Sequence, residues 1–112
     1  MEMVVSSMKR CDLVKLSGQI DSSTAPALED QLLELVESGK GNLVLDVGEV
    51  TFLSSAGLKA LLHAQIRIRQ KTKHGRVALA DVPPRLKDTF ELVGLHHIFD
   101  MYPDSTEAVG SF

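Results

Sequence analysis

The sequence predicts an α/β fold in which a mixed, mainly parallel β-sheet is flanked by about four helices. Two observations lead to this prediction. Short apolar segments alternate with longer segments whose apolar residues recur at helical spacing, which is typical of a parallel sheet covered by helices. Two strand-like segments at the start of the chain are close enough to form a hairpin, which adds an antiparallel edge. The 112 residues suit a single domain spanning 1–112.

Five segments are predicted to be strands. Residues 3–5 and 13–16 are joined by a polar hairpin at 9–12, and Gly18 ends the second of them. Residues 42–47 are nearly all apolar, which is typical of a central strand covered on both faces. The two remaining strands are short and span residues 77–80 and 98–102.

Three helices and a capped final turn complete the pattern. The first helix follows N-cap residues at 21–24 and ends at Gly39 and Gly41. Its apolar stripe consists of Leu28, Leu32, Leu35 and Val36. The second helix opens at 54–57, and its predicted buried residues are Leu58, Leu61, Leu62 and Ile66. The third opens at Pro83 and ends at Gly94, and its predicted buried residues are Leu86, Phe90 and Val93. Residues 104–107 form the last capped turn.

Composition and charge exclude several classes of function. The net charge of −3 is too mild for a protein whose main partner is nucleic acid. No apolar run approaches the ~20 residues of a membrane span, and the first residues lack the features of a signal peptide. Cys11 is the sole cysteine, which fits a reducing compartment. We therefore expect a cytoplasmic protein with no nucleic-acid or membrane partner.

Two serines, Ser54 and Ser55, lie where a strand gives way to the second helix. A serine hydroxyl at such a position commonly caps the helix by accepting from a free amide of the first turn. The alternative is a phosphorylation switch. A helix N-terminus carries unpaired N–H groups and about half a positive charge, so it tolerates a phosphate, which brings a charge of about −1.5 to −2 at pH 7. Phosphorylation there would alter the surface that a partner meets and leave the fold intact.

Acidic side chains are expected near these serines. Asp21 closes the second strand, and the loop that it enters is expected to lie beside the loop at 48–57, which contains Glu49. Asp46 is a third candidate, for which a buried and an outward side chain are both open. Asp21 is equally expected to serve as a helix N-cap.

An enzyme is not predicted. The G-x-S-x-G elbow of serine hydrolases is absent, because Leu53 stands two residues before Ser55. The histidines fall on no segment that clearly faces the serines and show no metal-ligand spacing; they are His63, His74, His96 and His97. No GxxxxGK[ST] segment for ATP exists, and the basic run from Arg67 to Lys73 is interpreted as a solvated helix face. No catalytic residue, cofactor or metal is expected.

Three segments, in this order, resemble the STAS-domain anti-sigma-factor antagonists. Residues 16–21 are similar to the family's early L-x-G-x-(L/I)-D segment, residues 52–58 to its phosphorylation segment, and residues 90–99 to its late (F/L)-E-L-x-G-(L/F) segment. The resemblance runs from about residue 3 to residue 110. It implies a mixed sheet flanked by helices and no catalytic activity.

The resemblance also implies a partner-switching mechanism. The unphosphorylated antagonist binds a serine/threonine kinase that is itself the anti-sigma factor, the kinase phosphorylates one serine and is released, and a metal-dependent serine phosphatase reverses the modification. The family's Asp-Ser-(Ser/Thr)-Gly pattern places the phosphoserine on Ser55, with Ser54 as second choice, and its early acidic residue on Asp21. This chain has Ser54 in place of the aspartate and Ala56 in place of the second hydroxyl residue, which bears on the identity of the kinase more than on the switch.

The expected partner-binding surface is the start of the second helix and the loop that precedes the first. Its residues are Asp21, Ser22, Ser23, Thr24, Ser54, Ser55, Ala56, Gly57 and Lys59. An alternative function is a STAS module without phosphorylation, as a scaffold or as a subunit of a regulatory or lipid-transport assembly.

Overall fold

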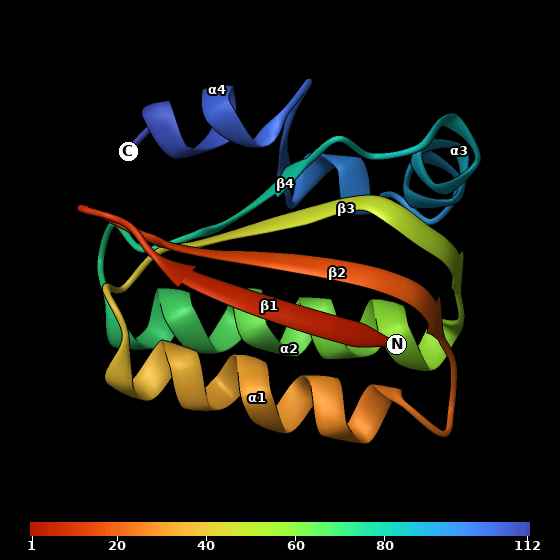
Figure 1. Ribbon diagram of the computed structural model, residues 1–112, viewed down its shortest axis with the longest axis horizontal. Coiled ribbons are helices and arrows are strands. Elements are labelled where there is room, and N and C mark those ends of the chain that lie inside the picture. Colours follow the sequence, from red (N-terminus) through yellow and green to blue (C-terminus); the bar gives the residue numbers. More distant parts are fainter.

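The computed structural model describes all 112 residues and contains one five-stranded sheet (Figure 1). The strands lie in sequence order: β1 (Glu2–Ser7), β2 (Asp12–Ile20), β3 (Leu43–Leu53), β4 (Val77–Ala80) and β5 (Asp100–Tyr102). β1 is antiparallel to β2, and the other three pairings are parallel. The predicted mixed, mainly parallel sheet is confirmed.

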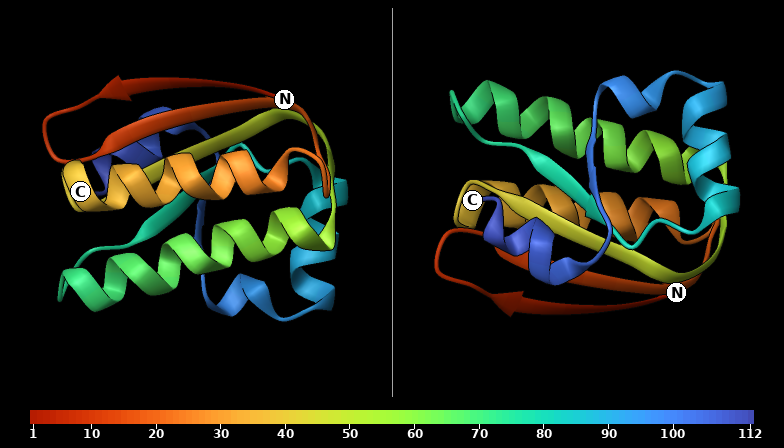
Figure 2. Two further views of the ribbon diagram at one scale, coloured as in Figure 1. Left: turned by 90° about the horizontal axis from the view of Figure 1, so that it is seen from below. Right: turned by 90° about the horizontal axis from the view of Figure 1, so that it is seen from above.

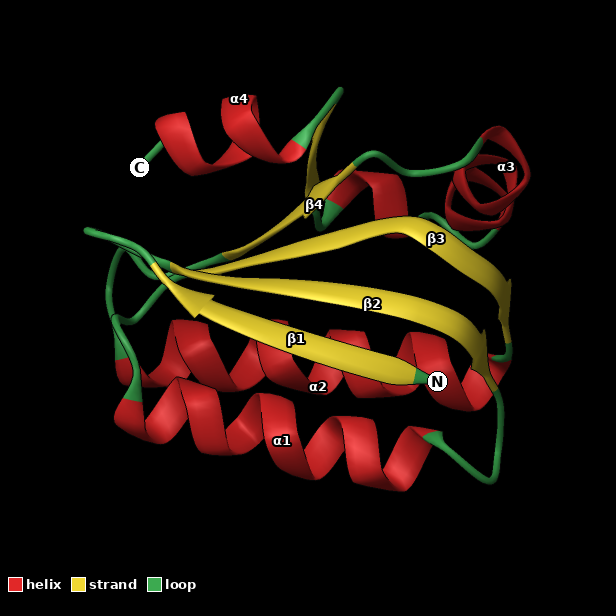
Figure 3. Ribbon diagram, in the orientation of Figure 1, coloured by secondary structure: helices red, strands yellow, loops and turns green.

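Helices cover both faces of the sheet (Figure 3). α1 (Ala25–Ser38) and α2 (Ser55–Lys71) lie side by side on one face (Figure 2, left). α4 (Ser105–Gly110) packs on the other face, against β3, β4 and β5. α3 (Pro84–Leu92) crosses the end of the sheet at which α2 begins, and the short 3-10 helix η1 (Leu95–His97) follows it. No helix is both long enough and apolar enough to cross a membrane.

The main core lies between the sheet and the pair α1 and α2. Leu28, Leu32 and Val36 of α1 are buried in it, as the helical spacing predicted, while Leu35 is only partly buried. Along β3, Leu45 faces this core and its neighbour Val44 faces a smaller core under α4. Both faces of β3 are therefore covered, which explains its nearly continuous apolar sequence.

β2 and β3 are longer than predicted. β2 continues through Gly18 to Ile20, and β3 continues to Leu53, so the predictions that Gly18 ends a strand and that residues 48–53 form a loop are wrong. The two strands pair across shifts in register, beside which Gly18 adopts a φ of +85°, a conformation that glycine adopts without steric cost. Pairing of Ile20 with Leu53 carries both strands to the same end of the sheet.

α2 buries a different face from the one predicted. Its buried residues are Gly57, Ala60, Leu61, Ala64, Gln65 and Ile68. Of the four predicted residues only Leu61 is buried, and Ile66 is 47% exposed. A Cβ on Gly57 would lie 2.6 Å from a methyl of Leu53 and 2.8 Å from one of Ile20. The small residues thus bring the helix close to the sheet, and Leu58 and Leu62 are left only partly buried.

The C-terminal third differs from the prediction between the end of α3 and the start of β5. α3 ends before Val93, which is 55% exposed and not part of the core as predicted. β5 begins at Asp100 and not at residue 98, because Leu95–His97 form a 3-10 turn. The strand at 77–80 and the capped final turn are confirmed, with the Asp104 side chain accepting from the N–H of Glu107 at 2.8 Å.

Candidate functional site

Strand pairing brings the two halves of the predicted site together. Ile20 and Leu53 are partners in the β2–β3 ladder, and the Ser54 N–H donates to the Ile20 carbonyl at 2.8 Å. The loop after β2 and the start of α2 therefore leave the same end of the sheet. Ser22 from the loop and Ala56 from the helix line one groove.

Ser54 is the N-cap of α2. Its backbone is extended, and its side-chain oxygen accepts from the Gly57 N–H at 3.2 Å. Its carbonyl accepts the first helical bond, from the Leu58 N–H at 2.9 Å. The capping role that the sequence assigned to a serine at this junction is therefore filled by Ser54.

Ser55 is the first residue of α2, and its side chain is exposed. Its hydroxyl forms no hydrogen bond with the rest of the chain, in contrast to that of Ser54. The hydroxyl is presented to solvent in the first turn, where the helix carries unpaired N–H groups and a partial positive charge. It is thus accessible to a modifying enzyme.

Asp21 holds the neighbouring loop in a defined turn. Its Oδ1 accepts from the N–H and the hydroxyl of Ser23, at 2.9 and 2.6 Å, and from the N–H of Thr24 at 3.2 Å. These hydrogen bonds, above all those from Ser23, lower the pKa of Asp21. Thr24 occupies the N-cap position of α1, but its side chain makes no capping bond there. Because its pKa is lowered, the Asp21 carboxylate is ionised at neutral pH. It lies in the loop that leaves the same end of the sheet as the start of α2.

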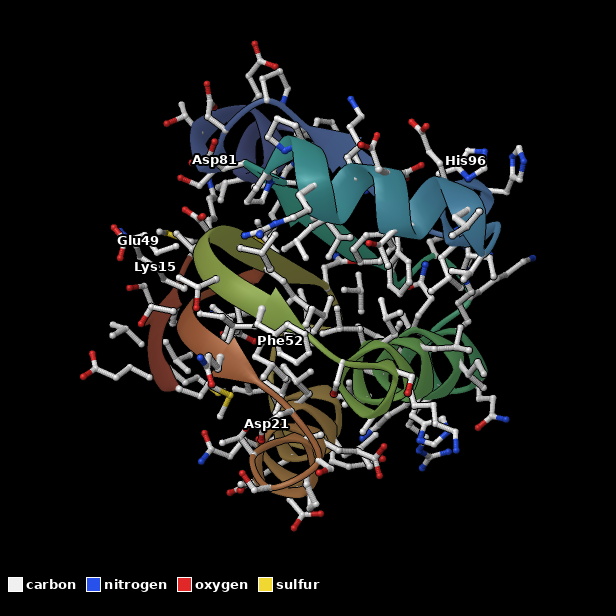
Figure 4. All side chains as sticks on the ribbon, turned by 90° about the vertical axis from the view of Figure 1, so that its right-hand side faces the viewer. Lys15, Asp21, Glu49, Phe52, Asp81 and His96 are labelled. Atoms are coloured by element: carbon white, nitrogen blue, oxygen red, sulfur yellow. The ribbon has the colours of Figure 1, made fainter.

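Glu49 and Asp46 do not belong to this site. Glu49 lies on β3 and its carboxylate is 3.5 Å from the Lys15 ammonium, apart from Asp21 (Figure 4). The strand rises about 3.3 Å per residue, so Glu49 lies roughly 13 Å before Leu53. The Asp46 carboxylate accepts from the Gly48 N–H at 3.0 Å. The expectation that Glu49 lies in a loop beside the serines is wrong, because that loop is strand.

An apolar groove borders Ser55 on one side. It has a volume of about 210 Å³ and is lined by Ser55, Leu58, Lys59, Leu62, Val93 and Leu95. Leu92 and Ile98, which are near the lining residues Val93 and Leu95 in the sequence, are 86% and 40% exposed. This surface was not predicted, because helical spacing assigned Leu58, Leu62 and Val93 to the core. One signal was available: α2 carries apolar residues on two faces, and one sheet can cover only one of them.

A second groove borders the start of α2 on the other side. It lies between α1 and α2 and is lined by Ser22, Ala25, Pro26, Glu29, Ala56, Lys59 and His63. His63 Nδ1 is paired with the Glu29 carboxylate across the two helices. Lys59 lines both grooves and forms no ion pair. Its ammonium is therefore free to meet an anion or a partner.

Gly57 is buried, so it supports the predicted surface by admitting the helix to the sheet and offers no contact of its own. Phe52, at the end of β3, is 50% exposed and lies on the same side of the molecule as Asp21 (Figure 4).

The remaining histidines lie elsewhere. His74 follows the end of α2, and His96 and His97 stack on each other in η1 with ring centroids 3.8 Å apart. No group of three or more His, Cys, Asp or Glu side chains is placed to hold a metal ion.

A family model described as "Mlab, STAS domain" matches residues 3–102. The chain belongs to the STAS-domain family. This STAS domain is 35% identical, over 87% of its length, to the anti-sigma-F factor antagonist RsfB of Mycobacterium tuberculosis, of which 77% is covered. It superimposes on a solved anti-sigma factor antagonist from Mycobacterium paratuberculosis with a TM-score of 0.85 and 31% identity, covering 98% of this chain and 92% of that one.

The same fold occurs in SpoIIAA, a Bacillus cell fate determinant solved in its phosphorylated form. The TM-score is 0.76 at 15% identity, and 98% of each chain is covered. The two relatives named above that are more than 30% identical to this STAS domain are anti-sigma factor antagonists, which are regulatory binding proteins and not enzymes. This agrees with the expectation that the chain has no catalytic activity.

Proposed function

We propose that this STAS domain is a cytoplasmic anti-sigma-factor antagonist that works by partner switching. In its unphosphorylated form it binds a serine/threonine kinase that is the anti-sigma factor. The kinase transfers a phosphate from ATP to the Ser55 hydroxyl, and the modified antagonist is released. A metal-dependent serine phosphatase removes the phosphate. The observation that carries this proposal is the free, exposed hydroxyl of Ser55 beside an apolar groove.

The environments of the two serines favour Ser55 as the acceptor. The Ser54 oxygen is engaged with the Gly57 N–H, so phosphorylation there would disturb the N-cap that starts α2. The Ser55 oxygen has no such role. A kinase that reaches Ser55 need not break any hydrogen bond of the fold.

The predicted effect of the phosphate is on binding and not on folding. A dianion in the first turn of α2 has the stabilising sign with respect to the helix dipole, worth about 0.3–1 kcal/mol. The same charge lies at the edge of the apolar groove, where a docked partner would have to remove it from water at high cost. The ionised carboxylate of Asp21 lies at the same end of the sheet, so it adds to the negative charge that a docking partner would meet.

The apolar groove supplies the surface that a partner would cover. Val93, which is 55% exposed, lines the groove together with Leu58, Leu62 and Leu95. Contiguous exposed apolar residues with a polar rim are typical of protein interaction sites. Docking on them would place the kinase next to the Ser55 hydroxyl.

The experiment compares Ser55→Asp with Ser38→Asp, which adds the same charge at an exposed position of α1. The kinase is captured from the host on the native chain and identified by mass spectrometry. Its affinity for each variant is then measured by calorimetry. We expect Ser55→Asp to bind at least about tenfold more weakly, which corresponds to about 1.4 kcal/mol, and Ser38→Asp to bind as the native chain does. Incubation with kinase and ATP should add one phosphate, on Ser55.

Equal binding by Ser55→Asp and the native chain would refute the switch. A phosphate found on Ser54 alone would refute the choice of Ser55 as the acceptor.

The second candidate is a STAS scaffold or assembly subunit without phosphorylation. It is favoured by Ser54 and Ala56, which replace the aspartate and the hydroxyl residue of the family pattern. Protein from the native host that carries no phosphate, in cells that contain the captured partner, would support this function.

A further inference from the structure

The two edges of the sheet differ in how well they are protected against pairing with another strand. β5 is only three residues long and is followed by Pro103, which cannot donate a backbone hydrogen bond. β1 has six residues in continuous register with β2, and its other side is unpaired. Lysine, proline and bulges, which commonly block an edge strand, are absent from it, and its one charged side chain, Glu2, is at its first residue. β1 is therefore an open edge.

The side chains of β1 are apolar at the centre of the strand and exposed. Val4 and Val5 are 61% and 44% exposed. Alternation along the strand puts Val4 on the opposite face from Met3 and Val5. α4 packs mainly against β3, β4 and β5, and it leaves Val4 exposed.

A groove runs beneath the open edge, between β1 and α1. It has a volume of about 360 Å³ and is lined by Met3, Val5, Gln31, Glu34, Leu35 and Ser38. Both faces of the edge thus carry apolar side chains next to unpaired backbone groups.

We propose that β1 pairs in antiparallel fashion with β1 of a second copy of this chain, so that the two five-stranded sheets become continuous. A two-fold axis perpendicular to the sheet relates the copies and sets like faces together. Residues that lie opposite each other must then have side chains on the same face. Because side chains alternate along the strand, the two residue numbers of each pair are both even or both odd, and their sum is even.

Among these registers, one matches the sequence of β1. With Val4 opposite Val4, Met3 lies opposite Val5 on the face of α1, and Glu2 lies opposite Ser6. Shifting the register either way sets Val4 against Ser6 or against Glu2. The first register pairs apolar with apolar side chains and keeps the two Glu2 carboxylates apart, which favours a second copy as the occupant.

Pairing through β1 leaves the groove beside Ser55 open. That groove is formed by α2, Val93 and Leu95, whereas β1 lies at the opposite edge of the sheet from β5 (Figure 1). The proposal is therefore independent of the proposed switch, and either one can fail without the other.

The register predicts a specific cross-link. Directly opposed residues in an antiparallel pair have Cα atoms about 4.5–5.5 Å apart, within the range that a disulfide spans. Val4→Cys should therefore form a disulfide-linked dimer under mild oxidation. Val5→Cys is the matched control, because Val5 opposes Met3 and its own counterpart lies diagonally, about 7–8 Å away or farther. Cys11 is buried, so the native chain should form no cross-link.

We expect Val4→Cys to cross-link at least tenfold faster than Val5→Cys on a non-reducing gel. No cross-link by either variant, or faster linkage of Val5→Cys, would overturn the proposal.

Sedimentation of the native chain provides a second readout. Its mass should rise with concentration from 12.2 kDa towards twice that value. Val4→Lys sets two ammonium groups against each other and should stay monomeric, while Ile66→Lys, at an apolar site of α2 that is 47% exposed, should dimerise as the native chain does. A native chain that stays monomeric up to millimolar concentrations would overturn self-pairing and leave the edge to a strand of another protein.

Discussion

Replacing Ser54 by alanine tests whether Ser54, and not Ser55, caps α2. The change removes the oxygen that accepts from the Gly57 N–H at 3.2 Å. Loss of a serine N-cap costs about 0.5–2 kcal/mol. Gly57 is buried, so water cannot readily replace the lost partner, and we expect the upper half of that range, about 1–2 kcal/mol.

The corresponding change in melting temperature follows from the size of the chain. An unfolding entropy of about 2.1 cal/mol/K per residue gives roughly 0.24 kcal/mol/K for 112 residues. Each kcal/mol then lowers the Tm by about 4 °C, so Ser54→Ala should melt about 4–8 °C below the native chain. The assay is thermal unfolding followed by circular dichroism, checked by urea denaturation.

Two variants complete the comparison. Ser55→Ala removes an exposed hydroxyl without a partner and should change stability by less than about 0.5 kcal/mol. Ser54→Asp keeps a capping oxygen and should remain close to the native stability. Equal losses in Ser54→Ala and Ser55→Ala would refute the assignment of the cap, and with it the reason for choosing Ser55 as the phosphate acceptor.

Three further predictions concern residues outside the cap. Gln65→Leu should lower the free energy of unfolding by about 2 kcal/mol or more, because the N–H of Val77 and the carbonyl of Ile98 lose their hydrogen-bond partners. Urea denaturation measures this change, and a difference within experimental error would contradict the prediction. Hydrogen bonds hold the folded pKa of Asp21 below its ordinary value of 3.8, so its carboxylate stabilises the fold above that pH, and this contribution disappears as the pH falls through the folded pKa. The native chain should therefore exceed Asp21→Asn in urea midpoint at neutral pH, with a gap that closes in acid; a gap independent of pH would show that the carboxylate charge is not involved. Burial, and to a lesser degree Asp12, raises the pKa of the Cys11 thiol, so a disulfide reagent should label it slowly in the folded chain and fully in guanidinium; rapid labelling of the folded chain would be the contrary result.

Several elements followed from local patterns alone. The spacing of Leu28, Leu32 and Val36 predicted the buried face of α1. The turn at residues 104–107 carried its own capping signal, and residues 77–80 formed a strand with the predicted bounds. Each of these signals lies within one element, where helical or strand periodicity decides which side chains share a face.

The candidate site was only partly predictable. Its position at residues 54–57 followed from the sequence, and so did Asp21 at the same end of the sheet. The sequence could not show whether Ser54 or Ser55 caps α2, because this depends on which residue takes the extended backbone before the helix. The prediction that Glu49 lies in a loop beside the serines was wrong, because pairing with β2 extends β3 through that segment.

The sequence by itself determined the order of the elements, the mixed sheet and the presence of a serine pair at the start of a helix. Tertiary structure alone decided which face of α2 is buried. Gly57, Ala60 and Ala64 let that helix approach the sheet, and close packing of the small face is possible only once β2 and β3 are in place. Leu58 and Leu62 are consequently only partly buried, and together with Val93 they line the groove next to Ser55. Periodicity identifies apolar faces, but which of two such faces meets the core depends on the shapes of the elements that pack against it.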